Sequence, residues 1–106
     1  MAKIELSPQI LVYTGRSRGR QDRARFLIDQ HDDSDEVVEV VVPDEIYSMT
    51  SSYFLELFGK SIRKLGRDEF LRKYAIVGPD HVLRKVDDWI ARALREKKGL
   101  FGGSSE

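Results

Sequence analysis

The segment of residues 46–66, which reads IYSMTSSYFLELFGKSIRKLG, constrains the fold of this chain more than any other. Large apolar residues recur there at spacings of four, four and three: Phe54, Phe58, Ile62 and Leu65. This spacing places them on one face of an α-helix. Gly66 follows directly, and glycine commonly ends a helix at that position. We therefore predict that a short strand turns, through a corner rich in hydroxyl groups, into a helix over residues 52–65.

The run EVVEVVV at residues 36–42 is the second constraint. Its β-branched residues are almost continuous, which is typical of a strand that is buried on both faces. Pro43 then ends the strand, because proline has no N–H group to donate to a neighbouring strand. We predict a central strand that helices cover on both sides.

The rest of the chain alternates short apolar runs with helical segments. The other predicted elements are strands at residues 3–6 and 10–13, a flexible loop at 14–20, a helix at 21–30, a helical turn at 67–73, a strand at 74–77 and a final helix with Asp80 as its N-cap. The two N-terminal strands are expected to pair as a hairpin. Together these elements predict an α/β fold: a single small layered domain over residues 1–98, with a mixed sheet of about four strands and helices packed on it. A flexible tail is predicted at residues 99–106.

The totals fit one globular domain. The chain has 106 residues, of which 41% are hydrophobic and 34% are charged. It contains no cysteine, which excludes a disulfide framework and a thiolate metal site. No apolar run approaches the roughly 20 residues that span a bilayer. We expect a cytoplasmic protein without membrane contact, and we expect neither a cofactor nor a metal site.

The serine corner carries a family resemblance. The motif consists of Ser51 and Ser52, Phe54 and Leu55, Glu56, and Phe58 and Gly59. It resembles the STAS-like domain family of unknown function, which is distantly similar to the STAS domains of anti-sigma-factor antagonists. Tyr53 is an insertion relative to the family pattern. The resemblance extends over about residues 13–95, and it implies a layered α/β fold and a non-enzymatic, regulatory protein–protein interaction module.

The resemblance also implies a regulatory site. In STAS domains the serine at this corner is the phosphorylation site that controls partner binding, so Ser51 and Ser52 are the candidate phosphorylation sites. The implied partner is a protein of the anti-sigma type, an ATPase or kinase. Thr50 stands where STAS domains usually carry an aspartate. The alternative is purely structural, because a serine at the start of a helix can cap it and contribute about 1 kcal/mol.

The residues around the serines indicate a partner surface. Tyr47, Met49 and Tyr53 bracket the hydroxyl groups within seven residues. Tyrosine and methionine are enriched at interfaces, so we predict an exposed, partly apolar patch that contacts a partner or a second copy of the chain. Thr50 and Glu56 complete the predicted partner-binding set. Taken singly, such residues are more often the edge of a core.

An anion site is predicted before the first helix, at Gly15, Arg16, Arg18 and Arg20. Guanidinium groups bind carboxylate and phosphate as forks, and glycine lets backbone N–H groups approach an anion. The alternative is a solvated surface that nearby acids neutralise, since the net charge is zero. Eight acids follow within residues 29–45, and no aromatic residues interleave the arginines, so nucleic-acid binding is not expected.

Catalysis is not predicted either. His31 and His81 lie in predicted connections, neither has ligand-type spacing to a second histidine, and the serines do not form a Gly-x-Ser-x-Gly motif. We therefore expect that the chain is not an enzyme. The acidic stretch leaves a second function open. In that alternative, a small protein of a phage or mobile element inhibits a large nucleic-acid machine by charge mimicry through residues 29–45.

Overall fold

The computed structural model of the chain describes the backbone of residues 2–104 and the side chains of residues 2–95. Its strands form two parallel sheets. The larger sheet has the order β1–β3–β5 and comprises β1 (Ala2–Glu5), β3 (Val38–Val41) and β5 (Tyr74–Val77). The other two strands, β2 (Val12–Tyr13) and β4 (Ser48–Met49), form a separate ribbon. The predicted α/β class is confirmed.

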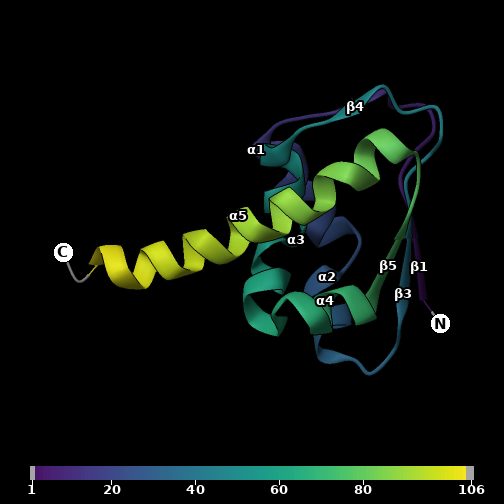
Figure 1. Ribbon diagram of the computed structural model, residues 1–106. Helices are drawn as coiled ribbons and strands as arrows, with labels where there is room; N and C mark the ends of the chain where they lie inside the picture. The colour runs from purple at the N-terminus through teal and green to yellow at the C-terminus, as the bar shows by residue number, and fades with distance from the viewer. Residues whose placement is uncertain (1, 105–106) are drawn as a thin grey trace.

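The described residues contain five helices, and all of them lie on one side of the larger sheet (Figure 1). They are α1 (Arg16–Arg25), α2 (Ile28–Asp33), α3 (Ser51–Leu65), α4 (Arg67–Lys73) and α5 (Asp80–Ser104). The central helix is α3, because it packs against each of the other four. Its apolar stripe explains this position. Phe54, Phe58 and Ile62 are all buried, and removing such side chains from water drives α3 into the core.

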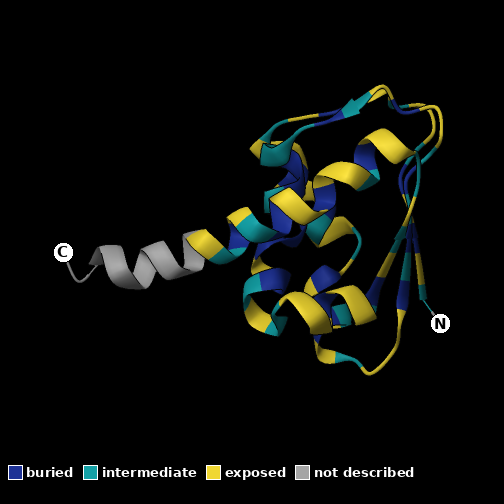
Figure 2. Ribbon diagram, viewed as in Figure 1, coloured by how far each residue is buried: buried dark blue, intermediate teal, exposed yellow. Residues whose placement is uncertain are grey.

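The outer face of the larger sheet is open, which corrects the prediction of a strand covered on both sides. As predicted, β3 is the central strand, and it buries Val38 and Val40 beneath the helices. Glu39 and Val41 alternate with them and are only half-buried, and Figure 2 shows exposed residues along the strands. The cause is topological. Right-handed crossovers that step in one direction along a parallel sheet place every connecting helix on the same face.

The predicted mixed sheet of about four strands, with its N-terminal hairpin, is not what the chain forms. Instead, β1 and β2 lie in different parallel sheets, paired with β3 and β4 respectively. The register places Ile4 opposite the buried Val40, and β3 pairs with β1 over four residues, whereas β2 has only two residues. The N–H group of Leu6 still donates to Val41 O at 3.0 Å. Residues 7–11 then carry the chain to the ribbon instead of reversing it.

The first helix begins where a loop was predicted. It starts at Arg16 instead of residue 21, so the segment of residues 14–20 is largely helical. Gly19, the second glycine of this segment, permits a close contact between α1 and α3, because a Cβ at this position would lie 2.5 Å from Cβ of Glu56. The glycine that indicated flexibility therefore lets α1 pack closely against α3.

The other boundaries follow the predictions to different extents. The helix predicted at residues 52–65 begins one residue early, and α4 and β5 have the predicted bounds. The helix predicted at residues 21–30 is interrupted at Leu27, whose backbone is left-handed with φ 58°. Asp80 is the first residue of α5 rather than the residue that caps it. The tail at residues 99–106 lies outside the residues whose side chains are described.

Candidate functional site

The ribbon brings the predicted serine site and the start of the arginine segment together. Its strands run parallel, with Tyr13 opposite Met49, and each leads within two residues into a helix. Thr14 and Gly15 connect β2 to α1, and Thr50 connects β4 to α3. Thr50 Oγ1 lies 3.5 Å from Thr14 Oγ1, so the two connections touch. The N-termini of α1 and α3 therefore meet at one end of the ribbon (Figure 1). We call residues 14, 15 and 50–52 the corner.

Thr50 is the residue that caps α3. Its Oγ1 accepts a hydrogen bond from the N–H group of Tyr53 at 3.4 Å, and its backbone is extended, as is typical of an N-cap. Ser51 and Ser52 are the first two residues of the helix, so the cap role predicted for them is wrong. The reason is that α3 begins at Ser51, one residue earlier than predicted. Both serines are half-buried, and Ser52 Oγ lies 3.1 Å from Thr50 Oγ1.

Two of the predicted anion-binding arginines contact an acid of α3. Arg16 Nε lies 3.2 Å from Glu56 Oε2, and Arg20 Nη1 lies 3.9 Å from Glu56 Oε1. Glu56 follows Ser52 by four residues, so the two side chains are neighbours on one face of α3. The basic face of α1 therefore borders the serine corner. Arg18 lies apart from this contact and lines a cavity between α1 and residues 6–10, which follow β1.

The apolar patch predicted around the serines is only partly exposed. Tyr47 is 78% exposed, but Met49 and Tyr53 are buried in the core. The hydroxyl of Tyr53 donates to Oδ2 of the buried Asp22, on α1, at 2.7 Å. Burial, followed by this hydrogen bond, raises the pKa of Tyr53. The prediction that Met49 and Tyr53 are exposed is wrong. Met49 on β4 belongs to the hydrophobic core, and α1 covers the side of α3 that carries Tyr53.

Two residues that the sequence does not single out complete the exposed patch. Leu11 and Val12 are 53% and 46% exposed. Leu11 O accepts hydrogen bonds from the N–H groups of Tyr47 and Ser48 at 2.8 and 3.2 Å, so Leu11 and Tyr47 are adjacent. We call Leu11, Val12 and Tyr47 the ribbon patch. The apolar run at residues 10–13 has the pattern of a buried strand, and only its place in a two-stranded ribbon leaves these side chains uncovered.

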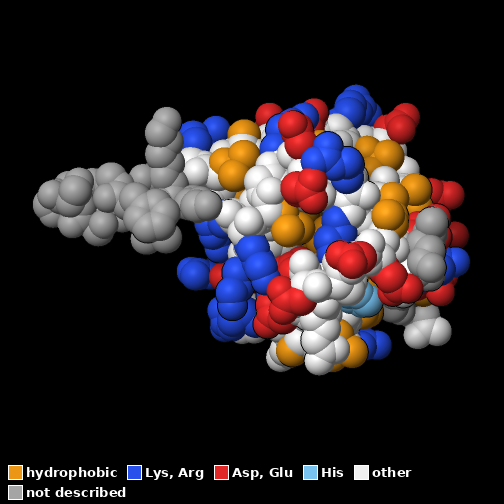
Figure 3. Space-filling view, turned by 90° about the horizontal axis from the view of Figure 1, so that it is seen from below, with side chains coloured by type: hydrophobic (Ala, Val, Ile, Leu, Met, Phe, Trp, Pro, Cys, Tyr) orange, Lys and Arg blue, Asp and Glu red, His pale blue; other side chains and the backbone are white. Residues whose placement is uncertain are grey.

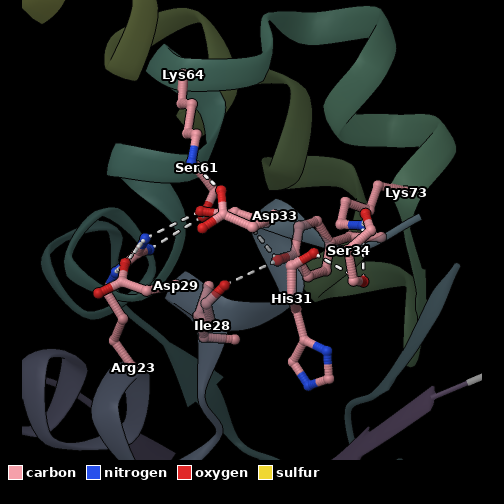
Figure 4. Close-up of polar contacts among 11 residues, drawn as sticks. Arg23, Ile28, Asp29, His31, Asp33, Ser34, Ser61, Lys64 and Lys73 are labelled. Carbon is pink, nitrogen blue, oxygen red and sulfur yellow. Dashed lines mark hydrogen bonds and ion pairs between the residues drawn. The ribbon is translucent and has the colours of Figure 1, made fainter. Parts of the chain in front are cut away.

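A buried polar network holds α2 in place (Figure 4). Asp32 Oδ2 accepts hydrogen bonds from Arg23 Nη2 at 3.1 Å and from Ser61 Oγ at 2.7 Å, and its Oδ1 accepts one from Tyr74 OH at 2.6 Å. Arg23 Nη2 also lies 2.7 Å from Asp29 Oδ1. Burial and then Asp32 raise the pKa of Tyr74, whereas the hydrogen bond from Arg23 lowers the pKa of Asp29. Because these polar groups satisfy one another, the network has a structural role.

The described part of the chain offers no group of three or more histidine, cysteine, aspartate or glutamate side chains that could hold a metal ion. His31 is half-buried on α2, and His81 is exposed near the start of α5. Within the described residues, no helix combines the length and the apolar character that crossing a membrane requires. Comparisons of the chain with models of protein families, with curated proteins and with solved structures found no match.

Proposed function

We propose that this chain is a non-enzymatic regulatory module that binds another protein through the ribbon patch and the corner. The observation that carries the proposal is the ribbon patch itself. Leu11, Val12 and Tyr47 expose large apolar side chains on the ribbon that leads into the serine corner. Adjacent exposed apolar side chains with a polar rim are typical of protein-binding surfaces. Here the corner, together with the arginines that pair with Glu56, supplies the rim.

The resemblance to STAS domains supports Ser51 or Ser52 as a regulatory phosphorylation site. A phosphoryl group adds roughly −1.5 to −2 charges, and the N-terminus of α3 tolerates them because of the helix dipole. A partner that covers the corner has to bury that charge, which is costly because the neighbouring Arg16 and Arg20 are already paired with Glu56. Phosphorylation therefore weakens the complex without unfolding the module.

The same resemblance supports a cytoplasmic partner of the anti-sigma type, an ATPase or kinase. It also supports a STAS-like arrangement for the α/β fold. The other occupant that the ribbon patch accepts is a second copy of the chain. The oligomeric state of the purified chain distinguishes the two occupants, since only a homodimer forms without a partner protein.

Quantitative binding to a captured partner tests the proposal. The immobilised chain captures its partner from an extract of the source cell, mass spectrometry identifies it, and biolayer interferometry measures the dissociation constant. Ser51→Glu and Ser52→Glu are each expected to weaken binding about tenfold or more. Val12→Thr is expected to weaken binding through the loss of apolar contact. Val77→Thr is the matched control, because Val77 is 42% exposed on the open sheet face, away from the ribbon.

Each outcome decides between the alternatives. Capture of an ATPase or kinase that both acidic variants lose supports the proposal. Equal binding by the parent, the acidic variants and Val12→Thr refutes it, and so does an equal loss in Val77→Thr. Concentration-dependent dimerisation of the purified chain, abolished by Val12→Thr, assigns the ribbon patch to a second copy.

Charge mimicry through residues 29–45 gains no support. Asp29 pairs with Arg23, and Asp33 pairs with Lys64. Asp32 is buried, and basic side chains lie beside acidic ones on the face seen in Figure 3. A mimic of nucleic acid needs a continuous surface of unpaired carboxylates, and these contacts interrupt such a surface at α2, which carries the first three acids of the stretch.

A further inference from the structure

A cavity of about 300 Å³ lies between α1 and the connection that follows β1. Leu6, Ile10 and Phe26 form its apolar wall. Glu5, the last residue of β1, also lines it, so the cavity lies at the carboxyl end of a parallel strand. Ligands of open α/β folds bind outside the carboxyl ends of strands, and this volume is within the range of small-molecule sites.

Two arginines of α1, Arg18 and Arg25, line this cavity. They are seven residues apart in the sequence, which places them on one face of the helix. The other three arginines of α1 are each paired with acids of α2 or α3. Among the described residues, neither Arg18 nor Arg25 takes part in an ion pair, although Arg25 Cζ lies over the ring of Phe26 at 5.7 Å. Their guanidinium groups are therefore available as forked donors for an anion.

A buried carboxylate lies between these arginines on the same helix face. Asp22 is 4% exposed and lines the cavity, and its Oδ2 accepts the hydrogen bond from Tyr53. Among the described residues Asp22 takes part in no ion pair within 4 Å, so its carboxylate attracts a cation that enters the cavity beside the two arginines. Glu5 adds a second carboxylate, which lies 3.8 Å from Nζ of the exposed Lys3. The cavity wall thus carries two positive and two negative side chains.

We propose that this cavity binds a small zwitterion, an α-amino acid with an apolar side chain. Its carboxylate pairs with Arg18 and Arg25, and its ammonium group pairs with Asp22. Its side chain rests against the apolar wall. Phosphate and other dianions fit poorly, because Glu5 and Asp22 repel the second negative charge. A ligand with only one charged end leaves either the arginines or Asp22 without its partner.

Titration with L-leucine and two truncated analogues tests the proposal. One analogue, 4-methylpentanoate, lacks the ammonium group, and the other, L-leucinamide, lacks the carboxylate. We expect leucine, or another apolar amino acid in a panel with isoleucine, valine, methionine and phenylalanine, to give a saturable calorimetric curve. It should also shift the NMR amide signals of the cavity wall. The two analogues of that amino acid, one without the ammonium group and one without the carboxylate, should bind at least about tenfold more weakly than the amino acid itself.

Three variants and one control locate the site. Arg18→Gln and Arg25→Gln are each expected to weaken amino-acid binding about tenfold. Arg20→Gln is the matched control on the same helix, and it should leave binding unchanged because Arg20 pairs with Glu56 outside the cavity. Asp22→Asn keeps an acceptor for Tyr53, and it should weaken amino-acid binding but not binding of the amine-free analogue. Circular dichroism confirms folding, and the arginine variants decide the question if Asp22→Asn does not fold.

Three results overturn the proposal. One is the absence of a saturable response to every apolar amino acid of the panel up to about 10 mM. Another is that the amine-free analogue or inorganic phosphate binds as tightly as the amino acid, which makes the cavity a simple anion site. The third is a loss of binding in Arg20→Gln as large as in Arg18→Gln.

Discussion

At the scale of single residues, one hydroxyl determines where the central helix begins. Thr50 Oγ1 accepts the hydrogen bond from the N–H group of Tyr53, so Thr50→Ala is expected to lower the free energy of unfolding by about 1 kcal/mol. Ser52→Ala, inside the first turn, should change it by less than about 0.5 kcal/mol. Urea denaturation checks both, with Thr50→Ser as the variant that retains the cap. A cost for Ser52→Ala as large as for Thr50→Ala would show that the serine is the cap after all.

Two neighbouring acids make a second test at this scale. Asp32 is buried in the polar network, whereas Asp33 is exposed and pairs with Lys64 at 2.6 Å. Asp32→Ala removes the buried carboxylate that Arg23, Ser61 and Tyr74 share and leaves Arg23 paired only with the exposed Asp29. A loss of about 3–5 kcal/mol is therefore expected. Asp33→Ala removes a surface ion pair and should cost at most about 1 kcal/mol. Chemical denaturation of both variants gives the comparison, and similar losses would contradict the role assigned to the network.

At the scale of elements, the contact between α1 and α3 depends on a glycine. A Cβ on Gly19 would lie 2.5 Å from Cβ of Glu56 and 2.7 Å from the backbone oxygen of Tyr53. Neither atom can move without shifting α3, so Gly19→Ala is expected to lower the free energy of unfolding by about 1–3 kcal/mol. The change should appear in thermal denaturation as a lower midpoint.

The control for this prediction is a second glycine, inside α3. A Cβ on Gly59 would meet the guanidinium group of Arg63 at 3.2 Å, and the far end of a long side chain can move. Alanine is the better helix former, so Gly59→Ala should be neutral or stabilising by up to about 1 kcal/mol. If Gly19→Ala lowers the free energy of unfolding no more than Gly59→Ala does, α1 and α3 do not approach each other as closely as the position of Gly19 beside Glu56 indicates.

At the scale of the whole molecule, two buried tyrosines connect elements that lie far apart in the sequence. Tyr53 joins α3 to Asp22 on α1, and Tyr74 joins β5 to Asp32 on α2. Burial, followed by these hydrogen bonds, raises the pKa of both hydroxyl groups above the usual value of about 10. The stability of the molecule is therefore linked to pH on the alkaline side.

The linkage predicts a loss of stability above about pH 10. There the unfolded state releases the two tyrosine protons while the folded state keeps them, so the free energy of unfolding falls as pH rises. Below that pH the contribution is fully present. Each tyrosine accounts for a loss of about 1.4 kcal/mol by about pH 11.

Urea unfolding at about pH 9 and about pH 11 measures this loss. In Tyr53→Phe the difference between the two conditions should be about 1.4 kcal/mol smaller than in the parent. Tyr47→Phe removes an exposed hydroxyl and serves as the control. An unchanged difference in Tyr53→Phe would mean that the buried hydroxyl does not carry the linkage.

By itself, the sequence determined the helices and strands of the second half. The spacing from Phe54 to Leu65 sets one helix face, Gly66 ends the helix, and residues 74–77 form the strand that was predicted. These signals act between residues that are close in the chain, so periodicity and terminal residues are enough to read them. The α/β class follows from the alternation of such elements.

Only the tertiary structure decided which faces are covered and which side chains meet. Asp32 is buried and Asp33 exposed although they are adjacent in one acidic stretch, because α2 turns only one of them toward the core. The open face of the sheet follows from strand order, which local spacing does not contain. The corner joins Thr14 and Thr50, which are 36 residues apart. A hairpin can be recognised from a short stretch, whereas a parallel ribbon requires segments that lie far apart in the chain.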